Sequence, residues 1–218
     1  MEQAAYETLV ARIRAEIPRF LTEKRLSHTF FVEKEAISLA ERVISVYNRD
    51  IDADELMQNL HLAALLHDIT KKCTGAEQLT LCARYGILVK DGTSPEILHA
   101  FTGAHVAREA FGINDAVFSA IWKHTTGSER MSLCDALLFI ADFTEESRTY
   151  EACVSTRTRL HASLSNAKTP EDASAALCEA MKSELDSTIT HLLEKGAVID
   201  PETIHCRNAL ITGAISLN

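Results

Sequence analysis

Histidines and aspartates recur in this chain within or at the ends of apolar, helix-like segments. They are His28, the adjacent pair His67-Asp68, His99, His124 and Asp142. Imidazole and carboxylate groups are costly to bury unless they are paired or bind a metal. A ligand set of nitrogen and oxygen atoms suits iron, manganese, zinc, cobalt or nickel and needs no thiolate. The pattern therefore predicts a metal site in a helical core, with each ligand or pair supplied by a separate helix.

The adjacent pair His67-Asp68 is the anchor of this pattern. Neighbouring side chains in a helix point about 100° apart, but at a helix end both can turn toward one centre. The carboxylate can then bridge two metals with its two oxygens. His28 and Asp142 would add ligands from two other helices. Because His99 and His124 lie between the pair and the final aspartate, the order of residues fits a two-metal site.

Helices must position these residues, because apolar side chains recur near the 3.6-residue period along most of the chain. Asp52 with Glu55 indicates a capping box at one helix start, and Ser132 with Asp135 indicates another. Gly86 is typical of a left-handed helix end. The expected helices span residues 5–17, 26–48, 53–68, 76–85, 102–111, 115–124, 132–143, 150–167 and 170–195, with further starts at 94–96 and 201.

The fold predicted from this pattern is all-α, because only eight glycines and four prolines leave little room for a turn-rich β protein. A length of 218 residues suits one domain, with or without an appendage. No candidate site residue lies beyond Arg148, and the pattern changes near Tyr150. We therefore expect a helical core with an N-terminal helix over residues 1–150. Residues 151–218 are expected to form a C-terminal helical appendage with a structural or oligomerisation role.

The charge and cysteine content exclude several classes of protein. A net charge of −9 argues against binding to nucleic acid or an anionic membrane, although a metal would still attract a small anionic substrate. No apolar run approaches the ~20 residues of a membrane-spanning helix, and the acidic start lacks a signal-peptide core. The six widely spaced cysteines indicate reduced thiols. We expect a cytoplasmic protein.

Several local strings resemble the YqeK family within the HD-domain superfamily of metal-dependent phosphohydrolases. The similarity covers about residues 20 to 150. The strings are Arg25-Leu26-Ser27-His28, Leu66-His67-Asp68-Ile69-Thr70-Lys71, His99 before Gly103-Ala104, His124-Thr125-Thr126-Gly127, and Asp142 followed by Glu145 and Arg148. The chain departs from the family pattern at Ala100-Phe101 and at Glu146-Ser147. The resemblance implies an HD-domain helical core and symmetrical hydrolysis of diadenosine tetraphosphate into two ADP.

The resemblance also implies two metal positions. His28, His67, Asp68 and Asp142 would hold one ion, and Asp68, His99 and His124 would hold the other. Iron is the metal expected from the family, while manganese, cobalt or nickel also suit these ligands. Two ions that share a hydroxide would lower its pKa toward neutrality and polarise a phosphoryl oxygen. Asp68 is therefore expected to take part in catalysis as the bridging ligand.

A tetraphosphate needs cations and hydrogen-bond donors besides the metals. Lys71 is expected to serve both catalysis and substrate binding, because it follows Asp68 by three residues. Arg148 can hold a phosphate through two parallel bonds, and Arg25 can orient a phosphate or brace the helix of His28. The remaining donors expected for substrate phosphates are Thr125, Thr126 and the backbone N–H of Gly127.

Other functions share this ligand order and stay open at this point. They are a nucleotide phosphatase or phosphodiesterase of different specificity, an HD-type di-iron oxygenase, and a degenerate module that binds nucleotides without turnover. His-Thr-Thr-Gly and Arg148 favour the hydrolase. We interpret His61 and His105 as packed or exposed histidines. The expected partner is a small nucleotide, with a homodimer as a further expectation.

Overall fold

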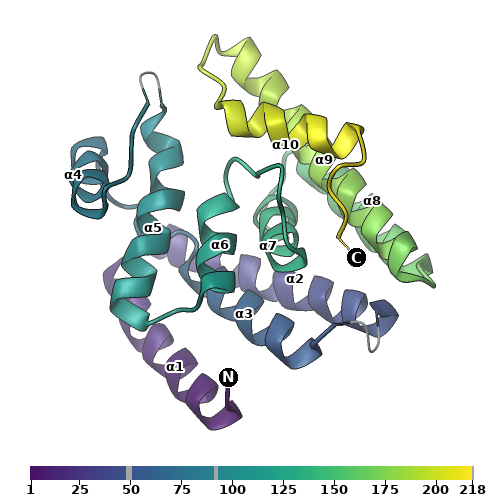
Figure 1. Ribbon diagram of the computed structural model, residues 1–218, viewed down its shortest axis with the longest axis horizontal. Coiled ribbons are helices and arrows are strands. Elements are labelled where there is room, and N and C mark those ends of the chain that lie inside the picture. Colours follow the sequence, from purple (N-terminus) through teal and green to yellow (C-terminus); the bar gives the residue numbers. More distant parts are fainter. Residues whose placement is uncertain (48–50, 91–92, 218) are drawn as a thin grey trace.

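The computed structural model describes residues 1–47, 51–90 and 93–217, and no strand occurs among them (Figure 1). Its elements are α1 (Gln3–Glu16), the short 3-10 helix η1 (Ile17–Arg19), α2 (Glu23–Tyr47), α3 (Ala53–Leu66), α4 (Gly75–Tyr85), α5 (Pro95–Phe111), α6 (Asp115–Lys123), α7 (Leu133–Thr144), α8 (Glu151–Asn166), α9 (Pro170–Glu194) and α10 (Pro201–Ile211). The all-α prediction is confirmed. Asn48, the predicted end of one helix, lies outside the described residues.

Helix α7 lies in the middle of the molecule, and every side chain from Cys134 to Ala141 is buried. A helix that is apolar on all sides needs cover on all sides. Helices α2, α3, α6 and α9 provide that cover (Figure 1). Leu66, Ile121 and Phe139 lie in the shared core. The ends of α3 and α6, where two candidate ligands are found, are therefore anchored in the core.

Polar caps fix where the central helices begin. The side chain of Asp52 accepts a hydrogen bond from the backbone N–H of Glu55 (2.9 Å) at the start of α3. At α7, Ser132 and Asp135 form both hydrogen bonds of the predicted capping box. Each such cap satisfies backbone donors that the helix itself leaves unpaired. The start of α7 therefore agrees with the predicted capping box, while α3 has the predicted Asp52 cap without the reciprocal bond from Glu55.

Helix α5 is longer than the separate segment expected from residue 102, because it runs unbroken from Pro95 to Phe111. Thr102 donates to the carbonyl of Leu98 (3.0 Å) within the helix, so its hydroxyl does not interrupt it. A Cβ at Gly103 would lie 3.4 Å from the carbonyl oxygen of His67. The glycine therefore allows α5 to approach the end of α3 closely.

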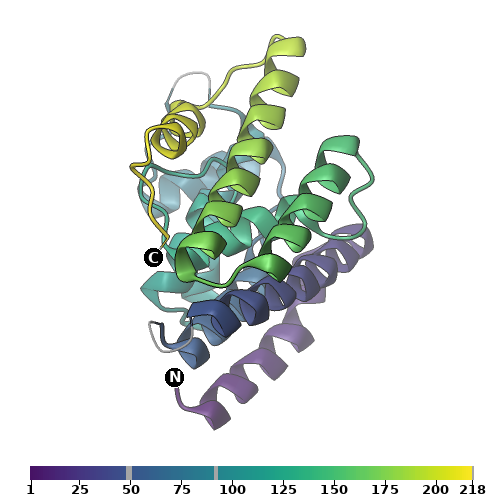
Figure 2. The ribbon, with the colours of Figure 1, turned by 90° about the vertical axis from the view of Figure 1, so that its right-hand side faces the viewer.

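The three C-terminal helices pack on the core rather than standing apart from it. Figure 2 shows α8 and α9 side by side above α2, and α9 also contacts α7. The hydroxyl of Tyr47 donates to the carbonyl of Leu217 (2.6 Å), which ties the C-terminal segment to α2. The division at residue 150 stays a prediction. Among the described helices, none combines the length and apolar character of a membrane span.

Candidate metal centre

The six predicted ligands meet at the centre of the molecule, although they come from five separate places in the chain. His28 lies in α2, His99 in α5 and Asp142 in α7, while His67-Asp68 and His124 follow the last turns of α3 and α6. Ligand atoms of His28, His67 and Asp68 lie within 4.8 Å of one another, and the same holds for Asp68, His99 and His124. Asp68 belongs to both groups, so the two adjoining sites share its carboxylate.

Asp142 completes the first of these groups. Its Oδ1 lies 2.9 Å from Nε2 of His28. On the other side of the cluster, Oδ1 of Asp68 lies 3.2 Å from Nε2 of His99, and the Nε2 atoms of His99 and His124 are 3.0 Å apart. The structure therefore brings the whole predicted ligand set together in the two groups that the resemblance implied.

Three of the histidines are oriented by the same kind of hydrogen bond, from the ring to a backbone carbonyl three residues earlier. The Nδ1–H of His67 donates to the carbonyl of Ala64 (2.8 Å), and that of His124 donates to Ile121 (2.7 Å). His99 makes the equivalent bond to Glu96, again three residues earlier. Because Nδ1 carries the proton, each Nε2 keeps its lone pair and points into the cluster.

His28 is oriented by a carboxylate instead. Its Nδ1 lies 3.1 Å from Oε1 of Glu145, a residue that is only 1% exposed. Ser147 holds the same carboxylate, since its hydroxyl donates to Oε1 at 2.6 Å. A carboxylate behind a ligating histidine fixes the ring and raises its basicity. Glu145 was read from the sequence only as part of a motif, and its pairing with His28 was missed.

The charges in the cluster suit a cation. Burial, together with the nearby His99 and His67, lowers the pKa of His124 to about 3, so its imidazole is neutral. Burial also lowers the pKa of His67. It opposes ionisation of Asp68 as well, yet His67, His99 and Lys71 outweigh it and hold the pKa of that carboxyl well below its usual range. Neutral imidazoles and ionised carboxylates are the forms in which these groups bind metals.

The surroundings of Nε2 of His67 indicate whether a metal ion fits this site. The side chain of His67 is fully buried, and its Nε2 has no hydrogen-bond partner among the described residues. An unpaired buried acceptor is costly, and a metal ion would satisfy it. The nearest carboxylate oxygen, Oδ2 of Asp68, is 3.6 Å from that nitrogen. The residues therefore fit a metal at this position.

Two arginines contact the carboxylates of the cluster. Nη1 of Arg25 lies 3.1 Å from Oδ2 of Asp68, and Nη2 of Arg148 lies 2.8 Å from Oδ1 of Asp142. Both arginines, with Lys24, also line a cavity of roughly 600 Å³ that reaches His28. A cavity of this size with three cationic side chains suits a phosphorylated ligand. Arg25 and Arg148 thus lie between this cavity and the carboxylates of the ligand cluster.

The other predicted substrate residues lie on the side of His99 and His124. Nζ of Lys71 is 3.2 Å from Nε2 of His99, and burial lowers the pKa of its ammonium. Oγ1 of Thr125 is 3.2 Å from Nε2 of His124. Both groups are therefore adjacent to the second ligand set.

Thr126 and Gly127 face away from the cluster. The hydroxyl of Thr126 is buried and donates to the carbonyl of Gly127 (3.0 Å). The N–H of Gly127, expected to serve a phosphate, donates instead to the carbonyl of Lys123 (2.9 Å). Gly127 has a φ of +67°, a left-handed conformation that favours glycine and turns the chain after the two threonines. The structure thus separates Thr125 from the other two predicted donors.

A further carboxyl near the cluster comes from the C-terminal helices, where no site residue was expected. Glu184 lies in α9 and is 9% exposed. Burial raises its pKa well above the usual range, and the negative charge of Asp142 raises it further. Helical spacing alone gave no signal for this position. It becomes notable only because α9 packs against α7.

Comparison with known proteins agrees with this geometry. The HD domain family matches residues 25–146, which include all six residues of the cluster. The symmetrical bis(5'-nucleosyl)-tetraphosphatase of Halalkalibacterium halodurans is 35% identical over 88% of this chain and 91% of its own length. The protein of the same name from Staphylococcus aureus is 31% identical over 86% of this chain and 87% of its own.

A solved structure gives the same result for the fold. The crystal structure of a predicted HD superfamily hydrolase involved in NAD metabolism from Clostridium acetobutylicum superposes with a TM-score of 0.77. The two proteins are 29% identical, and the match covers 94% of this chain and 97% of the other. The family resemblance predicted from the local strings is confirmed. The chain belongs to the HD domain family and, within it, to the YqeK group.

Proposed function

We propose that this protein is a metal-dependent bis(5'-nucleosyl)-tetraphosphatase that cleaves diadenosine tetraphosphate symmetrically into two ADP. The observation that carries the proposal is the position of Asp68 in both ligand groups. A carboxylate shared by two ligand groups could hold two cations a few Å apart. Relatives that cover most of the chain bear the name of this activity, which favours hydrolysis over the oxygenase alternative.

The six-residue cluster would hold the metal pair. His28, His67 and Asp142 would bind one ion, His99 and His124 the other, and Asp68 both. When bound, such ions supply Lewis acidity that polarises a phosphoryl oxygen and lowers the pKa of water. Iron is the metal we propose, and manganese, cobalt and nickel suit the same nitrogen and oxygen ligands.

The protein's own cations would hold and stabilise the tetraphosphate. Lys71 is adjacent to His99 and would neutralise charge that develops on the attacked phosphate. Arg25 and Arg148 lie at the cavity beside His28 and would bind outer phosphates, exchanging part of their contact with Asp68 and Asp142 for the ligand. Thr125 would donate a hydrogen bond on the side of His124.

The compartment belongs to the same proposal. All six cysteines are free thiols, and four of them are buried in the helical packing, namely Cys82, Cys134, Cys153 and Cys206. Reduced thiols of this kind are typical of the cytoplasm, where we place the protein. The structure describes a single chain, so the expected homodimer stays a prediction.

The test is an anaerobic assay of iron-loaded and manganese-loaded protein with diadenosine tetraphosphate, with products separated by chromatography. We expect ADP as the only nucleotide product. AMP together with ATP would mean that a different phosphate lies at the metals and would contradict symmetrical cleavage. An absence of product with both metals would reject the hydrolase, and oxygen consumption would then be measured on the same samples.

A further inference from the structure

A second cavity, of about 470 Å³, lies beside the half of the cluster formed by His99 and His124. It is lined by Leu98, the residue before His99, by Lys123, the residue before His124, and by Thr126, two residues after it. The loop that follows His124 thus has two faces. Thr125 lies at the ligand cluster, whereas Thr126 lines the cavity. Thr125 and Thr126 are adjacent in the chain, so this loop is shared by the ligand cluster and the cavity.

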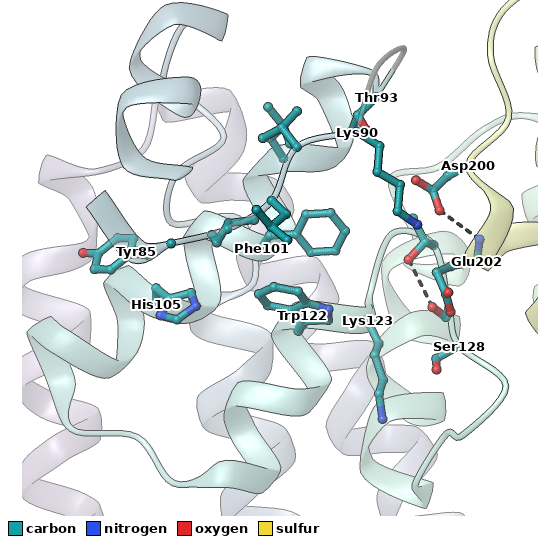
Figure 3. Close-up of a pocket in the computed structure, with 17 residues that line it drawn as sticks. Tyr85, Lys90, Thr93, Phe101, His105, Trp122, Lys123, Ser128, Asp200 and Glu202 are labelled. Carbon is teal, nitrogen blue, oxygen red and sulfur yellow. Dashed lines mark hydrogen bonds between the residues drawn. The ribbon is translucent and has the colours of Figure 1, made fainter. Parts of the chain in front are cut away.

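One wall of the cavity is aromatic. Phe101 and His105 come from α5, Trp122 from α6 and Tyr85 from the end of α4 (Figure 3). The rings of Phe101 and Trp122 are 4.5 Å apart at their centroids, and His105 stacks on Tyr85 at 4.8 Å. His105, which the sequence suggested was packed or exposed, therefore belongs to this wall.

The opposite wall is polar. Lys90 comes from the segment after α4, and Asp200 and Glu202 come from the start of α10 (Figure 3). The carboxylate of Asp200 accepts from the backbone N–H of Glu202 (2.9 Å) and so is held in place by its own helix. The cavity therefore offers flat apolar faces on one side and charged hydrogen-bonding groups on the other. Ligands that are flat, aromatic and polar at the edge match both walls.

The two cavities have no lining residue in common. The cationic cavity reaches His28, and the aromatic one adjoins the helices of His99 and His124. A bis-nucleoside polyphosphate has one nucleoside at each end of its phosphate chain. If the central phosphates lie at the cluster, one nucleoside extends toward each cavity. Base stacking on aromatic side chains tolerates different bases, because every base offers a flat π-face.

We infer that the cavity lined by Phe101, His105 and Trp122 is a nucleobase subsite that receives one of the two purines of the substrate. This inference rests on the proposed function for the identity of the ligand. The base stacks on the aromatic wall, and its polar edge faces Lys90, Asp200 and Glu202. The C-terminal helices then contribute to substrate binding through α10.

Trp122 is the single tryptophan of the chain, so its fluorescence reports on this cavity directly. The unmodified, metal-loaded protein is titrated with a diadenosine tetraphosphate analogue whose central bridging oxygen is replaced by methylene. We expect saturable quenching by the analogue and no quenching by inorganic tripolyphosphate, which carries phosphates without a base. An unchanged signal with saturating analogue would overturn the inference. An equal response to tripolyphosphate would do the same, because phosphates alone would then account for it.

A matched pair of variants checks the contact itself. Phe101→Ala removes part of the aromatic wall, while Leu79→Ala shortens an apolar side chain on α4 that is 51% exposed. We expect Phe101→Ala to weaken binding of the analogue about tenfold, within the range measured for stacking of one base, and to leave tripolyphosphate binding unchanged. Leu79→Ala should leave both affinities unchanged. Equal affinities for the analogue in the two variants would contradict the subsite.

The outcomes separate this inference from the proposed function. Quenching of Trp122 by the analogue without hydrolysis of diadenosine tetraphosphate would support the nucleobase subsite and reject the hydrolase. Hydrolysis to ADP with a silent Trp122 and full affinity in Phe101→Ala would support the hydrolase and reject the subsite.

Discussion

Gly127 and Cys206 are in direct contact, although one follows a candidate ligand and the other lies in α10. A Cβ added to Gly127 would be 2.6 Å from Sγ of Cys206 and 3.1 Å from its Cβ. Real Cβ atoms do not approach other atoms so closely, so the loop after His124 and α10 fit together only with glycine at this position. The C-terminal helices thus support the loop that carries Thr125.

Replacing Gly127 by alanine should strain both the loop and its contact with α10. The φ of +67° alone costs a non-glycine residue about 1–2 kcal/mol, and the overlap with Cys206 adds to this. We expect a lower melting temperature and a raised KM for diadenosine tetraphosphate. Gly112→Ala is the control, because Gly112 has the same φ sign but open space around its Cβ position. A Gly127→Ala variant no less stable than Gly112→Ala would contradict the contact.

The shared position of Asp68 predicts different metal losses for two variants. Asp68→Asn should remove both ions, because the carboxylate belongs to both ligand groups. His124→Ala should remove one, because His124 belongs to one group only. Metal content per chain, measured by mass spectrometry after dialysis, checks this, with Asp54→Asn in the first turn of α3 as the control. Retention of one equivalent by Asp68→Asn would show that the carboxylate is not shared.

Replacing Lys71 should lower turnover and leave the metal content unchanged. Its ammonium lies beside His99 and is expected to stabilise charge on the attacked phosphate. Removal of a comparable stabilising group from other active sites lowers kcat by about 10²–10³-fold, and we expect Lys71→Met to fall in this range. The neighbouring Lys72→Met is the matched control, because Nζ of Lys72 contacts the carbonyl of Arg19 instead. Equal kcat values for the two variants would exclude a catalytic role for Lys71.

The raised pKa of Glu184 predicts that the stability of the folded protein depends on pH. Burial, followed by the charge of Asp142, raises its pKa well above the usual range in the folded protein. In the unfolded chain the group ionises near pH 4.3, so its contribution is fully present below that pH and is lost as the pH rises toward the folded pKa. Each unit of pKa difference corresponds to about 1.4 kcal/mol.

Glu184→Gln removes this titration while keeping the shape of the side chain. The variant and the unmodified protein should have similar melting temperatures at pH 4.5, and the variant should be the more stable of the two at pH 8. Thermal unfolding at these two pH values and one between them gives the comparison. A stability difference that does not change with pH would mean that Glu184 is ionised in the folded protein.

The sequence predicted the helices well because their ends carry local signals. Gly86 adopts the expected left-handed conformation, and Ser132 with Asp135 forms the expected capping box. Such signals depend on residues only a few positions apart. The start of α5 at Ser94-Pro95 was predicted from such a signal, but its unbroken course through Thr102 was not. The sequence did not reveal that Gly103 packs against the backbone of His67, which depends on contacts between distant helices.

The distinction between local signals and contacts of distant helices applies to the site as well. Ligands such as His67 and Asp68 could be proposed from residue type and position at a helix end, and the structure brings them together. Glu145 could not be paired with His28 from the sequence, because that pairing depends on how α2 packs against the end of α7. The hydrogen bond from Thr126 to the carbonyl of Gly127, which occupies a hydroxyl expected to serve a phosphate, was likewise not evident from residue type. Residue types therefore indicated the chemistry, and packing determined which neighbours support it.

The backbone bonds made by His67, His99 and His124 also affect the entropy of metal binding. Each ring is tethered to a carbonyl of its own helix, so its torsions are restrained before any ion arrives. Ordering a free side chain costs about 0.5–1.5 kcal/mol, and here that loss occurs when the helices form. Because these ligands have already lost that freedom, the centre would bind a suitable ion more tightly than three untethered histidines could.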